Sequence, residues 1–531
     1  MIEFNEVTFT YPGQKQPTLD HISFSIPEGA FTLVTGRSGA GKSTLLRCVN
    51  GLVPHFSGGR IGGQIFINGL DPVQAGPQVM SDTVGFVFQD IESQFVVGRV
   101  EDEIAFSLEN AGIPMIEMKH RIDTVVEQLK IGSLRERKVE TLSGGEAQIV
   151  AIACAMALSP SILVLDEPTS QLDPEAAERL VQILLRLNRE NKVTILLAEH
   201  RLERIFPYAT HMIYVDGCPG RVTSGTPGEV MAQAPLCPPV VSLARRLHWQ
   251  PLPLTVEDAK RFAHLVTTPQ KTVSNEPVKT LEAFLEIEHL KVNHGRKEIL
   301  KDISLKINRG EIVVLMGANG TGKTTLLRTI MGIKQPEAGR IILNGRSVEK
   351  MTVAQRARQM AYLPQDPNAM LFADRVQDEL MITMRNHQMP FEWEAAAALL
   401  SQLGLSEKID AYPRDLSTGE RQRTALGAVT ITHPGGLLLD EPTRGMDYAA
   451  KQALGDLLKR WREDNISILL VTHDVEFAAQ CADRVMVLGE GTLQRMGEAR
   501  YVLSKEPGLT TQVAQLFPDR GWIIPEDVLY K

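Results

Sequence analysis

The chain has 531 residues, of which 43% are hydrophobic and 23% are charged, a composition typical of a folded globular protein and not of a disordered or fibrous one. Because domains commonly span about 100 to 200 residues, this length predicts three or four compact units. The formal net charge of -8 and the lack of a Lys/Arg block argue against a general nucleic-acid binder.

Cysteine usage and hydropathy indicate a cytoplasmic protein without a membrane span. The five cysteines are scattered and show no C-x-x-C spacing, which favours reduced thiols over metal ligands or disulfides. The N-terminal segment MIEFNEVTFTYP lacks the basic flank and apolar run of a secretion signal, so we expect none. The longest apolar stretch, IVAIACAMAL at 149–158, is shorter than the roughly 20 residues that cross a bilayer.

The first motif along the chain is a glycine-rich loop, VTGRSGAGKSTLL at 34–46. It fits the pattern G-x-x-x-x-G-K-[ST] between a β-rich apolar run and a helix-prone segment, the context that a phosphate-binding loop requires. Glycines let backbone N–H groups face phosphate oxygens, the lysine reaches the terminal phosphates and the hydroxyl ligates magnesium. The nucleotide-binding residues predicted here are Gly36, Ser38, Gly39, Gly41, Lys42, Ser43 and Thr44.

Two elements follow this loop before the next glycine motif. Gln89 ends the apolar run FVFQ, where its amide can ligate magnesium and sense its presence. Val100, Ile104, Leu108 and Ala111 recur at helical spacing and predict an amphipathic helix that packs in a helical subdomain.

The segment LSGGE at 142–146 places a serine and small residues at the predicted start of a helix. Such an N-terminus offers backbone N–H donors and a positive dipole end to an anion. This half of the chain already has its own phosphate loop. The binding residues predicted here, Ser143, Gly144 and Gly145, therefore lack an evident ligand within their own domain.

Two adjacent acids end the apolar segment ILVLDEP at 162–168. Burial of charge without a partner is unfavourable, so magnesium is the natural partner of this pair. We expect Asp166 to help hold the ion and Glu167 to polarise the attacking water. His200 follows 33 residues beyond Glu167, and we predict that it acts near the γ-phosphate; a structural histidine is the alternative.

The same succession of motifs returns in the second half of the chain. LMGANGTGKTTLL, LSTGE and LLLDEP repeat the phosphate loop, the serine motif and the acid pair, and a glutamine and a histidine recur in the same order. The residues predicted to bind nucleotide or to act in catalysis here are Gly317, Asn319, Gly320, Gly322, Lys323, Thr324, Thr325, Gln365, Ser417, Gly419, Glu441 and His473. The predicted magnesium ligands of the two copies are Ser43, Gln89 and Asp166, and Thr324, Gln365 and Asp440.

Between the copies lies a segment with the composition of a connector. Residues 217–282 hold nine of the thirty prolines, and proline-rich, strand-poor sequence suits a spacer between domains. We predict a first domain at 1–247, a linker with some local structure at 248–282 and a second domain at 283–531.

Phosphate loop, glutamine, LSGGE, LDEP, D-loop (SQLD and RGMD) and histidine, in this order, resemble the ATP-binding cassette (ABC) family over nearly the whole chain. The resemblance implies an α/β fold with two P-loop NTPase domains of the ABC type. Each would have a RecA-like α/β core, an antiparallel β subdomain and an α-helical subdomain, and would bind ATP and Mg²⁺. In that family two cassettes pair head to tail, so the LSGGE element of one closes over the ATP held by the other.

The resemblance therefore implies an intramolecular pairing of the two domains and explains why the phosphate loop occurs twice. Two departures bear on the sites. Thr418 stands where the first signature has Gly144, and we expect it to add a side chain near the phosphate and weaken that site. Tyr11 matches the aromatic that stacks on adenine in the family, whereas the second copy has His294. Each copy retains its glutamate and its histidine, so we predict that both sites hydrolyse ATP.

The segments after the two glutamines, QDIESQFVVGRVEDEIAFSLENAGI and QDPNAMLFADRVQDEL, resemble the ATPases of energy-coupling-factor importers, which drive uptake of a vitamin or a transition-metal ion. That resemblance implies an integral-membrane scaffold and a small substrate-capture membrane subunit as partners, no nucleic acid, and a peripheral place on the cytoplasmic face of the cell membrane. Two alternatives stay open: a tandem sugar-importer ATPase, whose signature resembles LSVGQQQ, and a soluble tandem cassette that acts on ribosomes.

Overall fold

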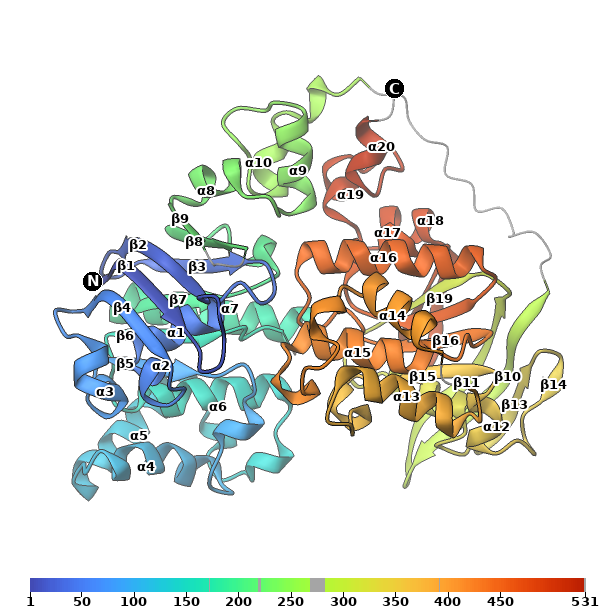
Figure 1. Cartoon of the computed structure of the whole chain (residues 1–531), viewed down its shortest axis with the longest axis horizontal. Coiled ribbons are helices and arrows are strands. Elements are labelled where there is room, and N and C mark those ends of the chain that lie inside the picture. The colour runs from blue at the N-terminus through green and yellow to red at the C-terminus, as the bar shows by residue number, and fades with distance from the viewer. Residues whose placement is uncertain (171, 218–220, 268–281, 391, 530–531) are drawn as a thin grey trace. The chain divides into compact units, whose positions relative to one another are not determined.

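The computed structural model describes residues 1–170, 172–217, 221–267, 282–390 and 392–529, and the chain divides into two compact units, Met1–Thr255 and Val256–Lys531 (Figure 1). Each unit contains one copy of the repeated motifs. Each is built from a mostly parallel sheet, an antiparallel sheet and a group of helices.

The core of the first unit is a six-stranded sheet of order β5-β6-β7-β3-β8-β9. Five of its strands run parallel, and β9 pairs antiparallel with β8. The central strands are buried along their whole length, as expected for apolar runs without alternation that are covered on both faces. The strands are β3 (Phe31–Gly36), β5 (Val84–Val87), β6 (Ile162–Asp166), β7 (Thr194–Ala198), β8 (His211–Asp216) and β9 (Arg221–Gly225).

A three-stranded antiparallel sheet, β2-β1-β4, forms the second layer of this unit. Its strands alternate between buried and exposed residues, the pattern of a sheet with one covered face. On that face Phe4 and Phe24 stack with ring centroids 4.5 Å apart. The strands are β1 (Ile2–Thr10), β2 (Leu19–Ile26) and β4 (Arg60–Ile67).

Helices α4, α5 and α6 of the first unit contact one another and form its helical subdomain (Figure 1). In α4 the predicted apolar face is buried at Val100, Ile104 and Leu108. The prediction that Ala111 belongs to this face is wrong: the helix ends at Asn110 and Ala111 is exposed, because Gly112 has φ 70°, a left-handed conformation that ends helices. The helices are α1 (Lys42–Val49), α2 (Leu52–His55), α3 (Pro72–Met80), α4 (Val100–Asn110), α5 (Met115–Leu129), α6 (Gly144–Met156), α7 (Pro174–Asn191), α8 (Pro227–Gln233) and α9 (Pro239–Arg246).

The second unit repeats this plan. Its six-stranded sheet has the order β15-β16-β17-β12-β18-β19, and its antiparallel sheet has the order β11-β10-β13-β14. The strands are β10 (Ala283–His294), β11 (Lys297–Asn308), β12 (Ile312–Met316), β13 (Ala338–Leu343), β14 (Arg346–Ser347), β15 (Met360–Leu363), β16 (Gly436–Asp440), β17 (Ser467–Val471), β18 (Arg484–Gly489) and β19 (Thr492–Glu498). The two units therefore place equivalent motifs at equivalent strand ends.

Helices α13 and α14 of the second unit pack against α15 and correspond to α4, α5 and α6 of the first. The helices are α10 (Val256–Lys260), α11 (Lys323–Met331), α12 (Val353–Ala357), α13 (Val376–Asn386), α14 (Trp393–Gln402), α15 (Thr418–Thr430), α16 (Tyr448–Glu463), α17 (Val475–Cys481), α18 (Ala499–Lys505), α19 (Gln512–Leu516) and α20 (Pro525–Leu529). The α/β class and the three subdomains implied by the family resemblance are confirmed in each unit.

The predicted linker, 248–282, falls partly on residues 268–281, which lie outside the described part of the chain. Within its described part, α10 packs against α19 of the second unit. The domain limits at 247 and 283 stay predictions.

Within residues 1–170, 172–217, 221–267, 282–390 and 392–529, no helix combines the length and apolar composition that crossing a bilayer requires. Of the cysteines, Cys48, Cys154 and Cys481 are buried free thiols, Cys237 is a partly buried free thiol, and Cys218 lies outside the described residues.

Candidate functional site

The first phosphate loop connects β3 to α1. Gly36 ends β3 with φ 146°, and a Cβ at this position would lie 1.9 Å from the carbonyl oxygen of Val215. The ammonium of Lys42 donates to the carbonyls of Gly36 (3.1 Å) and Arg37 (2.9 Å). α1 begins at Lys42 after Gly41, which has φ 97°. The loop thus ends at a helix N-terminus, where backbone N–H groups favour an anion.

The second phosphate loop has the same geometry between β12 and α11. Gly317 has φ 149°, and a Cβ there would lie 2.2 Å from the carbonyl oxygen of Leu488. Lys323 donates to the carbonyls of Gly317 (2.8 Å) and Ala318 (2.9 Å). Both lysines are buried at the base of their loops.

The acid that ends β6 meets the hydroxyl of the phosphate loop. Asp166 is buried and accepts a hydrogen bond from Ser43. Burial, and then the neighbouring charge of Glu167, raise the pKa of Asp166 to about 6. Among the described residues, its Oδ1 atom is buried without a hydrogen-bond partner. A buried carboxylate oxygen beside a hydroxyl fits the all-oxygen ligand set of magnesium.

The second unit repeats this arrangement at the end of β16. Asp440 is buried and accepts a hydrogen bond from Thr324, and burial raises the pKa of Asp440. Within the described chain its Oδ2 atom has no hydrogen-bond partner. Both units therefore offer a site whose donor set suits a magnesium ion bound together with a nucleotide.

In the first unit the predicted catalytic residues are in direct contact. Glu167 accepts a hydrogen bond from Nε2 of Gln89 (2.8 Å) on one carboxylate oxygen, and its other oxygen lies 2.9 Å from Nε2 of His200. Burial would raise the pKa of Glu167, but the interactions with His200, Lys42 and Gln89 outweigh it and lower the pKa. The carboxylate is thus held ionised, the form that polarises a water molecule.

In the second unit the contact between glutamate and histidine is present with a different ring atom. Nδ1 of His473 lies 3.0 Å from Oε1 of Glu441, and both side chains are largely buried. Gln365 follows β15 as predicted, but its side chain is exposed. The sequence placed the two glutamines in equivalent positions, whereas their surroundings differ between the units.

Both candidate catalytic glutamates have left-handed backbones, with φ 50° at Glu167 and 51° at Glu441. This conformation is uncommon for residues other than glycine and is typical of functional sites. The backbone N–H of each donates to the end of the neighbouring strand, at Ala198 (3.1 Å) and Val471 (2.9 Å), which holds the turn in place.

The signature segments begin helices α6 and α15. The Ser143 hydroxyl caps α6 in a reciprocal arrangement with Glu146, and Ser417 caps α15 with Glu420 in the same way. Such a capping box fixes the first turn of a helix. Gly144 in the first unit is exposed. The signature residues therefore lie at helix N-termini, where the sequence placed them, and their binding of an anion stays a prediction.

Thr418, the departure from the first signature, contacts the D-loop of its own unit. A Cβ at Gly445 would lie 3.0 Å from Cγ2 of Thr418 and 3.1 Å from its Cβ. Gly445 has φ 68° and lacks the side chain that would crowd Thr418. The corresponding residues of the first unit are Gly144 in the signature and Gln171 in the D-loop. The glycine is therefore in the signature of the first unit and in the D-loop of the second. Gln171 lies outside the described residues.

The two candidate adenine-stacking residues differ in exposure. Tyr11 is partly buried, its ring packs edge-on against Phe9, and its hydroxyl lies 3.0 Å from Oγ1 of Thr44. His294 ends β10 and is exposed. Their stacking on a base stays a prediction.

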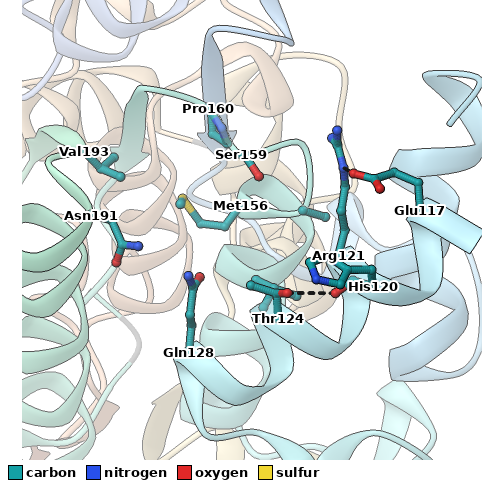
Figure 2. A pocket seen from close by; sticks show the side chains of 12 residues that line it. Glu117, His120, Arg121, Thr124, Gln128, Met156, Ser159, Pro160, Asn191 and Val193 are labelled. Carbon is teal, nitrogen blue, oxygen red and sulfur yellow. Dashed lines mark hydrogen bonds and ion pairs between the residues drawn. The ribbon is translucent and has the colours of Figure 1, made fainter.

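A cavity of about 330 Å³ lies elsewhere in the first unit, between α5 and the ends of α6 and α7 (Figure 2). Figure 2 shows Met156 and Asn191 on its wall, together with the Glu117–Arg121 ion pair, whose Nε and Oε1 atoms are 2.9 Å apart. Its lining includes none of the predicted site residues. This cavity is therefore separate from the candidate nucleotide site.

A buried acid beside the first site is not among the residues predicted from sequence. Glu199 accepts hydrogen bonds from the backbone N–H groups of Thr169 (2.8 Å) and His200 (3.1 Å). In the sequence it ends the apolar run TILLA and directly precedes the histidine. An acid at the end of a buried strand is the same signal that predicted Asp166, and the same signal points to Glu199.

Comparison with known proteins agrees with this geometry. The family described as "ABC transporter" matches residues 19–170 and 300–444. An ABC transporter ATP-binding protein of Streptomyces avermitilis is 39% identical over 98% of this chain and 98% of its own length. A Bacillus subtilis protein named for HMP/thiamine import, YkoD, is 32% identical over 98% of this chain and 95% of its own.

Among solved structures, the archaeal ribosome recycling factor aABCE1, in complex with the ribosomal stalk protein aP1, matches with a TM-score of 0.59. It is 21% identical, and the match covers 94% of this chain and 91% of that one. At this identity the likeness concerns the fold of the tandem units alone.

Proposed function

The chain belongs to the ATP-binding proteins of ABC transporters and is an ATPase, and we propose that it drives an importer of the energy-coupling-factor type. The observation that carries the hydrolytic part is the contact of a buried glutamate with a histidine beside each phosphate loop. The importer class is supported by the segments after Gln89 and Gln365 and by a full-length relative named for HMP/thiamine import.

In the proposed reaction, Lys42 and Lys323 contact the terminal phosphates from the base of each loop, where they are buried. Ser43 with Asp166, and Thr324 with Asp440, would hold magnesium, which neutralises phosphate charge when bound. The glutamate of each unit polarises the attacking water. The histidine beside it orients the carboxylate and faces the γ-phosphate.

We propose that each signature completes the site of the other unit. Ser417 and Gly419 would then contact the nucleotide held by the first phosphate loop. Ser143, Gly144 and Gly145 would contact the nucleotide held by the second. ATP stabilises this closed pairing and hydrolysis releases it, because the nucleotide binds the closed state better than the open one. A membrane partner whose conformation is coupled to this closing and opening is driven between two states.

The crossed pairing predicts a crossed pattern of defects. In an Glu441→Gln background, where only the first site hydrolyses, Ser417→Ala should lower the ATPase rate at least fivefold and Ser143→Ala should lower it less than twofold. In a Glu167→Gln background the two serine variants should exchange effects. Steady-state ATPase assays on the four double variants test this.

The serine variants control for each other, since each loses an equivalent helix cap that contributes about 0.5–2 kcal/mol. A drop in stability alone would lower the ATPase rate equally in both backgrounds. If Ser417→Ala affects only the second site, each signature serves its own unit and the crossed pairing is wrong.

The importer class predicts particular membrane partners and a peripheral position on the cytoplasmic face. Purification of the tagged chain from its own membranes in mild detergent should yield a multi-spanning scaffold and a small integral capture subunit, identified by mass spectrometry. Proteoliposomes that contain this complex should take up the vitamin or transition-metal ion bound by the capture subunit only when ATP is present on the chain's side. Recovery of sugar permeases, or of ribosomes without membrane subunits, would assign the chain to another class.

A further inference from the structure

The loop that carries the histidine is tied to the rest of the site by different chemistry in the two units. The segments TILLAEHR and SILLVTHD correspond residue by residue, so Glu199 of the first unit has Thr472 as its counterpart. Both side chains are buried. Since the second unit folds in the same way around a threonine, the fold does not require a carboxylate at this position.

In the first unit this carboxylate joins the two segments that bear the catalytic residues. Its Oε1 accepts the backbone N–H of Thr169, two residues beyond Glu167, at 2.8 Å. Its Oε2 accepts the backbone N–H of His200 at 3.1 Å. Thr169 also donates its hydroxyl. Glu199 thus bridges the backbone on both sides of the contact between Glu167 and His200.

The second unit makes an equivalent connection through an ion pair. Oγ1 of Thr472 accepts the backbone N–H of Asp474 at 3.1 Å, and the Asp474 carboxylate lies 2.6 Å from Nζ of Lys451 on α16. Asp474 directly follows His473, and α16 directly follows the D-loop. The first unit has Ala177 at the position of Lys451, and cannot make this pair.

Burial raises the pKa of Glu199, and a buried carboxyl group is unfavourable unless its oxygens are hydrogen-bonded. Replacing a neutral threonine by a glutamate therefore has a cost that the hydrogen bonds across the loop must offset. These hydrogen bonds connect the segment that bears His200 to the segment that bears Glu167, and so they fix the spacing of the two side chains.

We propose that Glu199 is a positioning residue of the first ATP site, which holds His200 against Glu167, and that the Lys451–Asp474 pair holds His473 in the second. We assign none of these three residues a contact with the reacting atoms. The kinetic test below rests on the proposed hydrolysis at both sites, whereas the spectroscopic test does not.

The kinetic test uses the substitution that the second unit itself carries. In the Glu441→Gln background, Glu199→Thr should lower kcat at least tenfold and change KM for ATP less than twofold, because the phosphate loop is untouched. In the Glu167→Gln background the same substitution should leave kcat unchanged. Lys451→Ala, the residue of the first unit, should show the reverse pattern.

Glu103→Gln is the matched control for loss of a buried carboxylate. Glu103 is buried in the same unit and also accepts two backbone N–H groups, from Val96 (2.8 Å) and Val97 (2.6 Å), but it contacts neither Glu167 nor His200. This variant should lower Tm about as much as Glu199→Gln and keep first-site kcat within twofold, whereas Glu199→Gln should lower first-site kcat as Glu199→Thr does. The proposal would be overturned if Glu103→Gln and Glu199→Gln lowered first-site kcat equally. It would also be overturned if Glu199→Thr lowered kcat in both the Glu441→Gln and the Glu167→Gln backgrounds.

The second readout is the ¹⁵N resonance of the His200 ring, assigned by comparison with His200→Gln in protein labelled at its 12 histidines. Glu199→Thr should shift this resonance toward that of a ring without the Glu167 contact, and Glu103→Gln should leave it in place. An unchanged resonance would refute the positioning role. If Glu441→Gln alone abolishes ATPase activity, hydrolysis at the first site is wrong, and the resonance still decides the role of Glu199.

Discussion

ATP binding at the first phosphate loop should weaken at least tenfold when Gly36 is replaced by alanine. The backbone φ of 146° is one that L side chains rarely adopt, and the new Cβ would lie 1.9 Å from the carbonyl oxygen of Val215. That carbonyl belongs to β8, which is paired with β3, so it cannot move aside without breaking the sheet. The loop must move instead, and a tenfold loss corresponds to about 1.4 kcal/mol of binding free energy.

Gly317→Ala should have the same effect at the second loop, where the Cβ would lie 2.2 Å from the Leu488 carbonyl oxygen. Gly29→Ala and Gly345→Ala are the matched controls, since each has a positive φ (72° and 71°), no atom within 4 Å of an added Cβ, and a place outside the predicted nucleotide-binding residues. Calorimetric titration with a non-hydrolysable ATP analogue and Mg²⁺ measures each site. Binding by Gly36→Ala as tight as by Gly29→Ala would show that the close approach to β8 does not shape the loop.

The phosphate loops and the acid pairs could be predicted from sequence because each depends on contiguous residues. A strand, a glycine loop and a helix in succession determine where Lys42 and Lys323 lie, whatever surrounds them. The acids at the ends of β6 and β16 follow from the same reasoning, because the carboxyl ends of parallel strands meet at one edge of a sheet.

The contacts that hold the histidine loops could not be predicted in this way. Glu199 and Thr169 are 30 residues apart and meet only because β6 and β7 are neighbours in the sheet. Lys451 and Asp474 are 23 residues apart and meet through the packing of α16 on α17. Their partners depend on tertiary contacts that no local pattern records.

Local conformation was also beyond the motifs. The pattern L-D-E-P gives no indication that Glu167 and Glu441 have a positive φ, and the ring atom that each histidine presents to its glutamate differs between units whose motifs are alike. In the same way, Gln365 is exposed although its position after the strand was predicted. The neighbours of each side chain decide these details.

These differences lead to an expectation about unequal sites. In the first unit both oxygens of Glu167 are engaged, one by Gln89 and the other by His200, so the carboxylate is held in one orientation. In the second unit Glu441 lies beside His473 while Gln365 is exposed. A glutamine that helps to orient the carboxylate preorganises it for water activation, and the exposed Gln365 does not take this role in the second unit. The first site should therefore hydrolyse ATP faster.

Glu167→Gln should consequently remove more than half of the ATPase activity, Glu441→Gln a smaller but measurable share, and the double variant should be at least a hundredfold slower than the original chain. Glutamine preserves the shape of the side chain and the left-handed turn, but it cannot serve as a general base, whose loss typically slows a reaction 10²- to 10⁴-fold. Steady-state ATPase assays at saturating ATP give the rates, and analogue titration confirms that binding is retained. Full activity in either single variant would mean that the corresponding glutamate does not act in hydrolysis, because a buried carboxylate in contact with the histidine would then be dispensable.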